Sequence, residues 1–407
     1  MSPTLEIQKQ LQVFEEGTVD LISKPELKSK LETASKEKKP LRIKYGADPS
    51  SPDLHLGHTV PLRRLRAFQE LGHTIVFIIG DFTALIGDPT QRIQTRPMLS
   101  EDEVKQNAAT YQEQVFRILD REKTEVRYNS EWLGKMTSAE FLQLTAQYTV
   151  ARLLERDDFQ KRYKKGSPIA LVEFLYPLLQ GYDSVVLHSD IEIGGTDQKF
   201  NLLMGRELQR VWNQPPQVVM TFPIIEGLDG VQKMSKSLNN HIALEDPPNE
   251  MFGKIMSLPD TLMESYYRYV SALPSEKIKE VMKAMKAGKI HPRDAKADLA
   301  EQIVGLYYSE TEAKSARREF DQIFRDRGLP QEIPSVTLRV KQCDIVTLLK
   351  DSGLVESKGE ARRLIEQGGV KVEQKKVTDP MTPIDLAQPV IVQCGKRKFA
   401  KVQYHAG

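Results

Sequence analysis

The chain has 407 residues, and its 58 Lys and Arg are almost balanced by 56 Asp and Glu, giving a net charge of +2. This length suggests two or three domains with a substantial core. The charge balance excludes a generally basic nucleic-acid-binding chain, so any RNA-binding surface must be local. Cys343 and Cys394 are too few for a disulfide framework and lack zinc-site spacing. No stretch is apolar enough for a signal sequence or a membrane span, which predicts a soluble, cytoplasmic protein.

The first part of the chain alternates strand-like and helix-like stretches. Strands are expected near residues 42–45, 74–80, 125–128, 190–193 and 218–225. This alternation predicts an α/β fold, with a Rossmann-type parallel-sheet domain over residues 1–246. Ligands bind beyond the carboxyl ends of such strands. The segments 46–48, 80–83 and 194–197, which follow three of the strands, are therefore candidate site segments.

The pattern changes after residue 246. Residues 247–327 are rich in charged residues, and their apolar residues recur with the spacing of a helix. This pattern predicts an α-helical domain with a basic face, although an ordinary solvated helix surface explains most of the individual lysines. A Pro-containing stretch, 328–340, predicts a linker. Residues 341–407 carry 12 Lys and Arg against 8 Asp and Glu, and this local excess suggests contacts with phosphate groups.

The motif His55-Leu56-Gly57-His58 follows a strand-like run and a loop that contains Gly and Pro, and a helix-like stretch comes after it. It therefore falls at a predicted helix N-terminus, where free N–H groups and the helix dipole favour an anion. Gly57 allows a nucleotide to approach the backbone closely. Two exposed histidines near a turn are the alternative, which the strand, loop and helix context disfavours.

The sequence Lys-Met-Ser-Lys-Ser occupies residues 233–237 in a stretch rich in Gly, Ser and Asn, which predicts a mobile loop. Lys233 and Lys236 on such a loop can close over a triphosphate and open to release pyrophosphate. A solvated basic loop is the alternative, but a complete pentapeptide of this kind rarely arises by chance. With the histidine motif, it predicts activation of a carboxylate by ATP through stabilisation of developing negative charge.

Residues 173–184 are expected to form a helix. Tyr176, Gln180 and Asp183 then stand at i, i+4 and i+7 and share one face. Amphipathic packing explains the neighbouring leucines but is a poor explanation for an aspartate beside an apolar run. The shared face predicts a single binding site.

The two motifs, in this order and at this spacing, resemble the signatures of class I aminoacyl-tRNA synthetases. More closely, the chain is similar to the bacterial tyrosyl-tRNA synthetases from about Leu41 to its C-terminus. The resemblance implies that tyrosine reacts with ATP to give tyrosyl-adenylate and pyrophosphate, and that tyrosine then passes to the 3′-terminal adenosine of tRNA(Tyr). It also implies Mg²⁺ with ATP as co-substrate, no tightly bound protein metal site, and a homodimer.

The resemblance also assigns roles to individual residues. The catalytic residues are His55, His58, Lys233, Lys236, Arg92 and Arg96, of which the last two are equally well explained as ordinary loop arginines. The residues assigned to binding of ATP and the adenylate are Gly46, Asp48, Gly57, Gly195, Asp197, Gln198 and Ser235. Tyrosine is assigned to Thr83, Asp88, Asn129, Tyr176, Gln180 and Asp183. In this set the ammonium group of the substrate is held by Tyr176, Gln180 and Asp88. Asp183 accepts a hydrogen bond from the substrate phenol.

Residues 357–372 resemble an S4 domain, a small α+β RNA-binding module. Lys358, Arg362 and Arg363 fall on about one turn of its expected helix and are the predicted RNA contacts. Lys396–Lys398 could extend this patch, although a basic β-turn is an equal alternative. The predicted C-terminal domain therefore spans residues 341–407.

Lys44 departs from the tyrosyl pattern, because many members carry there a second tyrosine that reaches the phenol. Strand alternation should turn Tyr45 to the opposite face, so the phenol's second partner stays open and Asp183 alone carries the predicted specificity. Three other functions fit the sequence less well. Another nucleotidyltransferase would not explain residues 233–237 with an S4-like tail, a tryptophan-specific relative would not explain Asp183, and a non-catalytic RNA-binding paralogue would need no intact ATP site.

Overall fold

The computed structural model describes residues 3–49, 53–90, 100–324, 333–395 and 398–404. The chain divides into two compact units, Met1–Arg317 and Arg318–Gly407. The predicted Rossmann-type segment and almost all of the predicted helical segment therefore belong to one unit. No helix in the described ranges is long and apolar enough to cross a membrane.

A six-stranded sheet of order β1-β6-β5-β2-β3-β4 forms the centre of the first unit. Its strands are β1 (Asp20–Ile22), β2 (Arg42–Ala47), β3 (Thr74–Ile79), β4 (Thr124–Tyr128), β5 (Ile191–Gly195) and β6 (Val218–Phe222). The five predicted strands are confirmed, and they pair in parallel. The short β1, which the sequence did not predict, pairs antiparallel with β6. β3 is apolar and buried almost throughout, as expected for a central parallel strand covered on both faces.

The strand order fixes where a ligand can bind. From β2 the chain moves outward to β3 and β4, then returns to β5 on the other side of β2. A topological switch point therefore lies between β2 and β5, and ligands bind at the carboxyl ends of strands there.

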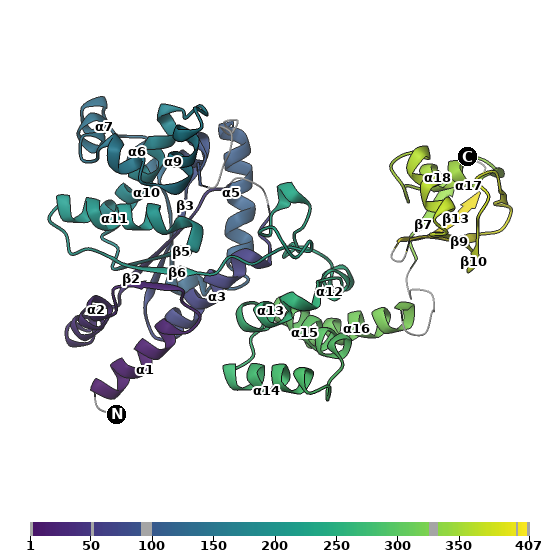
Figure 1. Ribbon diagram of the computed structural model, residues 1–407, viewed down its shortest axis with the longest axis horizontal. Coiled ribbons are helices and arrows are strands. Elements are labelled where there is room, and N and C mark those ends of the chain that lie inside the picture. Colours follow the sequence, from purple (N-terminus) through teal and green to yellow (C-terminus); the bar gives the residue numbers. More distant parts are fainter. Residues whose placement is uncertain (1–2, 50–52, 91–99, 325–332, 396–397, 405–407) are drawn as a thin grey trace. The chain divides into compact units, whose positions relative to one another are not determined.

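Helices cover both faces of this sheet. Figure 1 shows α10 and α11 on one side and α3 and α5 on the other. The helices are α1 (Pro3–Glu15), α2 (Lys24–Glu37), α3 (Leu56–Glu70), α4 (Asp81–Ile86), α5 (Glu101–Val115), α6 (Ser130–Leu133), α7 (Ser138–Thr145), α8 (Val150–Leu153), α9 (Asp157–Lys164), α10 (Leu171–Leu187) and α11 (Lys199–Val211).

A run of helices follows the sheet, as predicted for this segment, and the structure describes it as far as Phe324. It comprises α12 (Pro248–Met256), α13 (Met263–Tyr269), α14 (Ser275–Lys286), α15 (Pro292–Tyr307) and α16 (Glu310–Phe324). Tyr266 and Tyr267 of α13 are almost completely buried, and the Tyr267 hydroxyl donates to the Ala295 carbonyl of α15 at 2.6 Å. Buried aromatic rings with a satisfied hydroxyl thus fix α13 against α15.

The second unit has a five-stranded sheet of order β10-β9-β12-β13-β7 and a two-stranded sheet of β11 and β8. Its elements are β7 (Ser335–Leu338), β8 (Gln342–Asp344), α17 (Ile345–Asp351), α18 (Lys358–Glu366), β9 (Val370–Val372), β10 (Lys375–Lys376), β11 (Pro383–Asp385), β12 (Val390–Cys394) and β13 (Lys398–Tyr404). Part of the predicted linker, 328–340, is thus a strand, because β7 pairs in parallel with β13. Residues 328–332 of that prediction lie outside the described residues.

Candidate active site

The histidine motif begins α3, as the sequence predicted. His55 is the N-cap, and its Nδ1 accepts the Gly57 N–H at 3.2 Å. His58 Nδ1 accepts the His55 N–H at 3.2 Å. Because each Nδ1 accepts a hydrogen bond, this network assigns the proton of each neutral ring to Nε2. Both Nε2–H groups are therefore available as donors at the helix N-terminus.

Burial lowers the pKa of both imidazoles. The pKa of His58 falls to about 4, and that of His55 falls well below its usual value through burial and then through its neighbour His58. Both rings are thus neutral near pH 7. At this site the histidines supply hydrogen-bond donors, whereas the cations must come from other residues.

Backbone pairing joins the two sequence motifs. The Leu56 N–H donates to the Ile242 carbonyl at 3.0 Å, and the Leu244 N–H donates to the Leu54 carbonyl at 3.0 Å. These bonds hold the start of α3 against the chain that follows residues 233–237. The two motifs, far apart in the sequence, therefore lie at one end of the sheet.

The loop of residues 233–237 is fixed by Asn240. The Asn240 side chain accepts the Ser235 N–H at 2.8 Å and donates to the Lys233 carbonyl at 3.1 Å. Gly57 lies against this loop, because a Cβ placed on it would stand 3.7 Å from the Met234 Cβ. A side chain at Gly57 would crowd the His55 ring, to which a Cβ would lie at 3.0 Å.

Both motif lysines pair with carboxylates. Lys233 Nζ lies 3.4 Å from Asp197 Oδ2, and Lys236 Nζ lies 2.5 Å from Asp53 Oδ2. Both lysines are partly exposed, so each ammonium can exchange its carboxylate for a bound anion without burial. Asp197, predicted to contact the adenylate, thereby lies next to the loop, and burial raises its pKa while Lys233 opposes that rise.

Asp48, just beyond β2, accepts two hydrogen bonds from residues predicted to bind tyrosine. Thr83 Oγ1 donates to Oδ1 at 2.7 Å, and the Tyr176 hydroxyl donates to Oδ2 at 2.8 Å. Gly80 makes this approach possible, because a Cβ there would lie 2.1 Å from Asp48 Oδ1. The residues predicted to bind the nucleotide therefore meet those predicted to bind the substrate tyrosine at the Asp48 carboxylate.

Asp88 and Gln198 form a second link between the two sets. Gln198 Nε2 donates to Asp88 Oδ2 at 2.7 Å. Gly195 ends β5 and precedes the short 3₁₀ turn Thr196–Gln198, and a Cβ there would lie 2.6 Å from Asp197 Oδ1. A Cβ on Gly46 would meet no atom within 4 Å, so the end of β2 borders open space. Arg92 and Arg96 lie outside the described residues.

Tyr176, Gln180 and Asp183 all belong to α10, which confirms the predicted helix. Asp183 is buried, and it accepts hydrogen bonds from Trp132 Nε1 at 2.8 Å and from Asn129 Nδ2 at 3.5 Å. Burial raises the pKa of the Asp183 carboxyl to about 7, against the opposing charge of Lys44. Asp183 is thus a buried acid that titrates near neutrality.

Lys44 does not supply the open second contact to the phenol. Its ammonium is fully buried and lies 2.8 Å from Glu192 Oε1, 2.9 Å from the Gln180 carbonyl and 2.8 Å from Ser184 Oγ. A lysine ammonium has three donors, and these three acceptors account for all of them. Its effect on the site is electrostatic, because its charge lowers the pKa of Asp183.

Sequence reasoning missed Trp132, Ser184 and Glu192. Glu192 interrupts the apolar run of β5, and a charged residue inside a buried strand was an available signal for a buried partner. Trp132 and Ser184 gave no comparable signal. Tyr45 packs against Phe77 at a ring distance of 5.9 Å, away from α10, as strand alternation predicted.

The predicted RNA contacts lie on the outer face of α18. Lys358, Arg362 and Arg363 are exposed, whereas Ala361 and Ile365 of the same helix are fully buried in the core of the second unit. Within the described ranges the three basic residues form no ion pair. Elsewhere in those ranges, no three His, Cys, Asp or Glu side chains are grouped so that they could hold a metal ion.

Comparison with known proteins decides the family. Residues 36–325 match the model of the class I tRNA synthetases (W and Y), and residues 345–387 match the S4 domain. The tyrosine–tRNA ligase of Moorella thermoacetica is 51% identical over 397 residues, which cover 98% of this chain and 96% of that protein. That of Thermotoga maritima is 51% identical over 395 residues, 97% of each chain. The chain belongs to the class I tyrosyl-tRNA synthetases.

Solved structures of this family share the fold. A C-terminally truncated mitochondrial tyrosyl-tRNA synthetase of Aspergillus nidulans has a TM-score of 0.64 at 22% identity, covering 79% of this chain and 99% of that chain. The Archaeoglobus fulgidus tyrosyl-tRNA synthetase complexed with L-tyrosine has a TM-score of 0.61 at 23% identity, covering 76% and 99%.

Tyrosine affinity should rise with pH through about 7, because the predicted phenol contact favours the ionised form of Asp183, whose pKa is about 7. Linkage then allows a change of up to about tenfold per pH unit below that pKa. Calorimetric titration with tyrosine from about pH 5.5 to 8 measures this slope. The Asp183→Asn variant should bind more weakly and lack the slope, and a slope that persists in this variant would assign the titration to another group.

Replacing Lys44 by Met should destabilise the fold, because Glu192 would keep a buried charge without its partner. Breaking a buried pair in this way costs about 3–5 kcal/mol. Urea unfolding measures the loss. The double variant Lys44→Met/Glu192→Gln should be more stable than Lys44→Met alone, and a single variant as stable as the parent would contradict the buried-pair argument.

Proposed function

We propose that this protein activates L-tyrosine with ATP and then transfers tyrosine to the 3′-terminal adenosine of tRNA(Tyr). The backbone pairing of residues 54–56 with 242–244 carries this proposal, because it brings both signature motifs to the strand ends where the candidate tyrosine residues lie. Membership of the tyrosyl-tRNA synthetase family supports the same reaction.

In the first step a tyrosine carboxylate oxygen bonds to the α-phosphorus of MgATP. The bond to the bridging oxygen of the β-phosphate breaks, and pyrophosphate leaves. His55 and His58 donate through Nε2, while Lys233 and Lys236 move from their carboxylates to the phosphates. Preorganised donors and charges of this kind stabilise the transition state without a side-chain nucleophile. Arg92 and Arg96 are proposed to assist at the pyrophosphate.

Positioning comes from the residues that link the two substrates. Asp48, Asp197 and Gln198, with Gly46, Gly57, Gly195 and Ser235, hold the nucleotide. The tyrosine ammonium meets Tyr176, Gln180 and Asp88, and Thr83 and Asn129 shape the pocket around the phenol, which donates to Asp183. In the second step the terminal ribose hydroxyl of tRNA attacks the adenylate carbonyl, and AMP leaves.

The second unit is proposed to hold tRNA through Lys358, Arg362 and Arg363, whose exposed charges form no ion pair within the described ranges. Mg²⁺ enters with ATP as part of the substrate. Because tRNA and ATP meet in the cytoplasm, we place the reaction there. The proposed domains are the catalytic segment 1–246, a tRNA-binding helical segment 247–327 and an RNA-binding segment 341–407.

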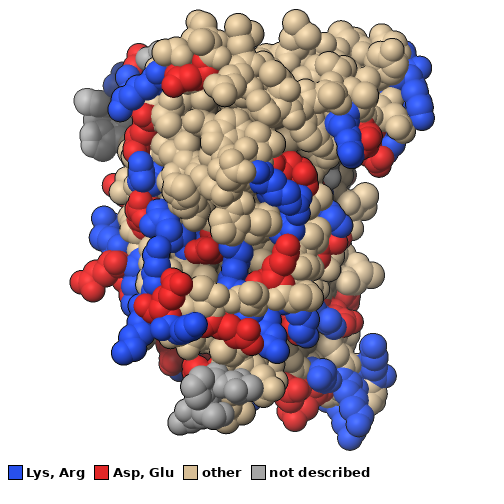
Figure 2. All heavy atoms as spheres, turned by 90° about the vertical axis from the view of Figure 1, so that its left-hand side faces the viewer, with Lys and Arg blue, Asp and Glu red and all other residues tan. Residues whose placement is uncertain are grey.

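A homodimer is proposed from one apolar surface. Leu142 of α7, Val150 of α8, Tyr163 of α9 and Leu171 of α10 are 59–81% exposed. Figure 2 shows that the upper part of this face, over these helices, carries few charged side chains, whereas charges of both signs cover the lower part. Large exposed apolar side chains on a face with few charges are typical of an interface, and a second copy can cover such a face symmetrically.

Lys236→Ala should slow tyrosine-dependent ATP–pyrophosphate exchange by about 10²–10³-fold, because it removes a charge used in the transition state. Tyrosine binding should change little, since Lys236 pairs with Asp53 and not with the residues proposed to bind the tyrosine substrate. Lys277→Ala, on exposed α14, is the control. Exchange with tryptophan in place of tyrosine, or equal losses in exchange and tyrosine binding, would contradict the proposal.

Reversing two charges on α18, Arg362→Glu/Arg363→Glu, should weaken tRNA binding by at least about tenfold and flatten its salt dependence. Filter binding at several salt concentrations measures both effects. Pyrophosphate exchange, which needs no tRNA, should stay at the parent rate. The control is Lys36→Glu/Lys39→Glu, an equal charge change at an exposed residue of α2 and one just after it. An equal loss of tRNA binding in the control would show that the effect comes from the net charge of the chain and not from α18.

Leu142→Glu/Leu171→Glu should convert a dimer to a monomer, because two charges would be buried without partners at the proposed interface. Light scattering after size-exclusion chromatography gives the mass directly. A parent chain that is monomeric, or a variant that stays dimeric, would place the interface elsewhere or remove it.

A further inference from the structure

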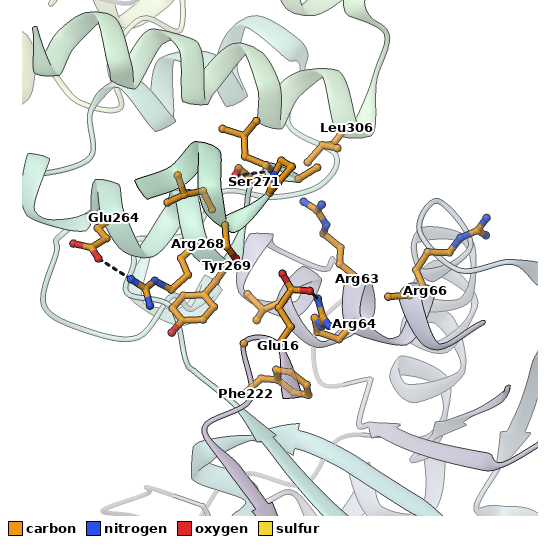
Figure 3. A pocket seen from close by; sticks show the side chains of 18 of the residues that line it. Glu16, Arg63, Arg64, Arg66, Phe222, Glu264, Arg268, Tyr269, Ser271 and Leu306 are labelled. Atoms are coloured by element: carbon orange, nitrogen blue, oxygen red, sulfur yellow. Dashed lines mark hydrogen bonds and ion pairs between the residues drawn. The ribbon is translucent and has the colours of Figure 1, made fainter. Parts of the chain in front are cut away.

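A cavity of about 1060 Å³ lies in the first unit, between α3 and the helical segment that includes α13 and α14. Figure 3 shows Arg63 and Arg64 of α3 on one side and Arg268, Tyr269 and Ser271 on the other. None of the described residues that were individually assigned above to tyrosine, ATP or RNA lines it, although one side of the lining belongs to the helical segment 247–327. The cavity is thus separate from the candidate active site, although α3 begins at that site and continues to the cavity.

The lining is strongly basic. It contains eight Lys or Arg residues and three Glu residues. The three glutamates are each paired with one arginine, as in the Glu16–Arg64 pair at 3.1 Å and the Glu264–Arg268 pair at 2.8 Å. The cavity therefore keeps an excess of positive charge after its own ion pairs are counted, and a concave surface focuses such a field.

Three of the basic residues have no ion pair within the described ranges: Arg63, Lys283 and Lys286. Arg63 is half-buried, its Nη1 donates to the Val270 carbonyl at 2.6 Å, and burial lowers its pKa. Lys283 and Lys286 are exposed on α14 at the other side of the cavity. A partly desolvated guanidinium without a carboxylate and two exposed ammonium groups in the same lining are suited to an anion with several charges.

The uncharged part of the lining includes the apolar or aromatic side chains of Tyr269, Ile278, Met282 and Leu306, beside the hydroxyl side chains of Thr18, Ser271 and Ser275. Apolar and aromatic side chains bind a flat ring, and the cavity is at the upper end of the size range of small-molecule sites. We propose that this cavity binds a nucleoside polyphosphate, with the phosphates at Arg63, Lys283 and Lys286 and the base against the apolar wall. An RNA strand fits less well, because it spreads one charge per nucleotide along its length while these cations line a single concave volume.

Mant-GTP, a fluorescent nucleoside triphosphate, tests this site by anisotropy on the full chain. A non-hydrolysable tyrosyl-adenylate analogue is kept saturating so that the active site is blocked. We expect saturable binding of one mant-GTP per chain, and Lys283→Glu/Lys286→Glu should weaken it by at least about tenfold. Lys277→Glu/Lys289→Glu, an equal charge change nearby and outside the cavity, should leave it unchanged.

The outcomes separate the possible ligands. Absence of mant-GTP binding to the blocked chain, or an equal loss in the control variant, overturns the proposal. Inorganic tripolyphosphate that competes as well as GTP would overturn the part assigned to the base. If Lys283→Glu/Lys286→Glu weakens tRNA binding and not mant-GTP binding, the surface binds RNA instead. Pyrophosphate exchange is measured in parallel, so an inactive ligase and an empty second site give different results.

Discussion

The candidate site depends on a few backbone hydrogen bonds between residues 54–56 and 242–244. A parallel sheet brings its strand ends together by topology, but it leaves a long loop such as that of residues 233–237 without a fixed place. These bonds and the Asn240 side chain attach that loop to the start of α3. The neutral imidazoles and the lysines then face the same space beyond the sheet.

Burial sets the protonation of Asp183, the residue proposed to contact the tyrosine phenol. Asp183 sits where its ionised form is disfavoured, and three features of the surroundings favour that form: the charge of Lys44 and the donors of Trp132 and Asn129. Lys44 is itself tolerated only because Glu192 and two further acceptors satisfy its ammonium. Asp183, the proposed specificity residue, therefore depends on a polar network that extends across α10 into β5.

The sequence predicts the sheet because the central strands are long and apolar, and it predicts α10 and the start of α3 because the spacing of their residues is helical. It could not predict β1, which has only three residues at the sheet edge. Within the site, the motifs predicted which residues to expect and the fold class predicted the end of the sheet. The sequence could not predict the role of Lys44, because that role depends on Ser184, Glu192 and the Gln180 carbonyl, which come together only in the folded chain.

The carboxylates that pair with the motif lysines affect more than the geometry of the loop. Asp53 and Asp197 already neutralise Lys236 and Lys233 before a nucleotide arrives. In the function proposed here, binding of a triphosphate is therefore an exchange of counter-ions, in which the two lysines leave their carboxylates and phosphate oxygens take the place of those carboxylates. A small monovalent anion can replace only one of them and gains little from doing so. Selectivity for a polyanion can thus arise from the acidic residues that pair with the lysines as much as from the lysines themselves.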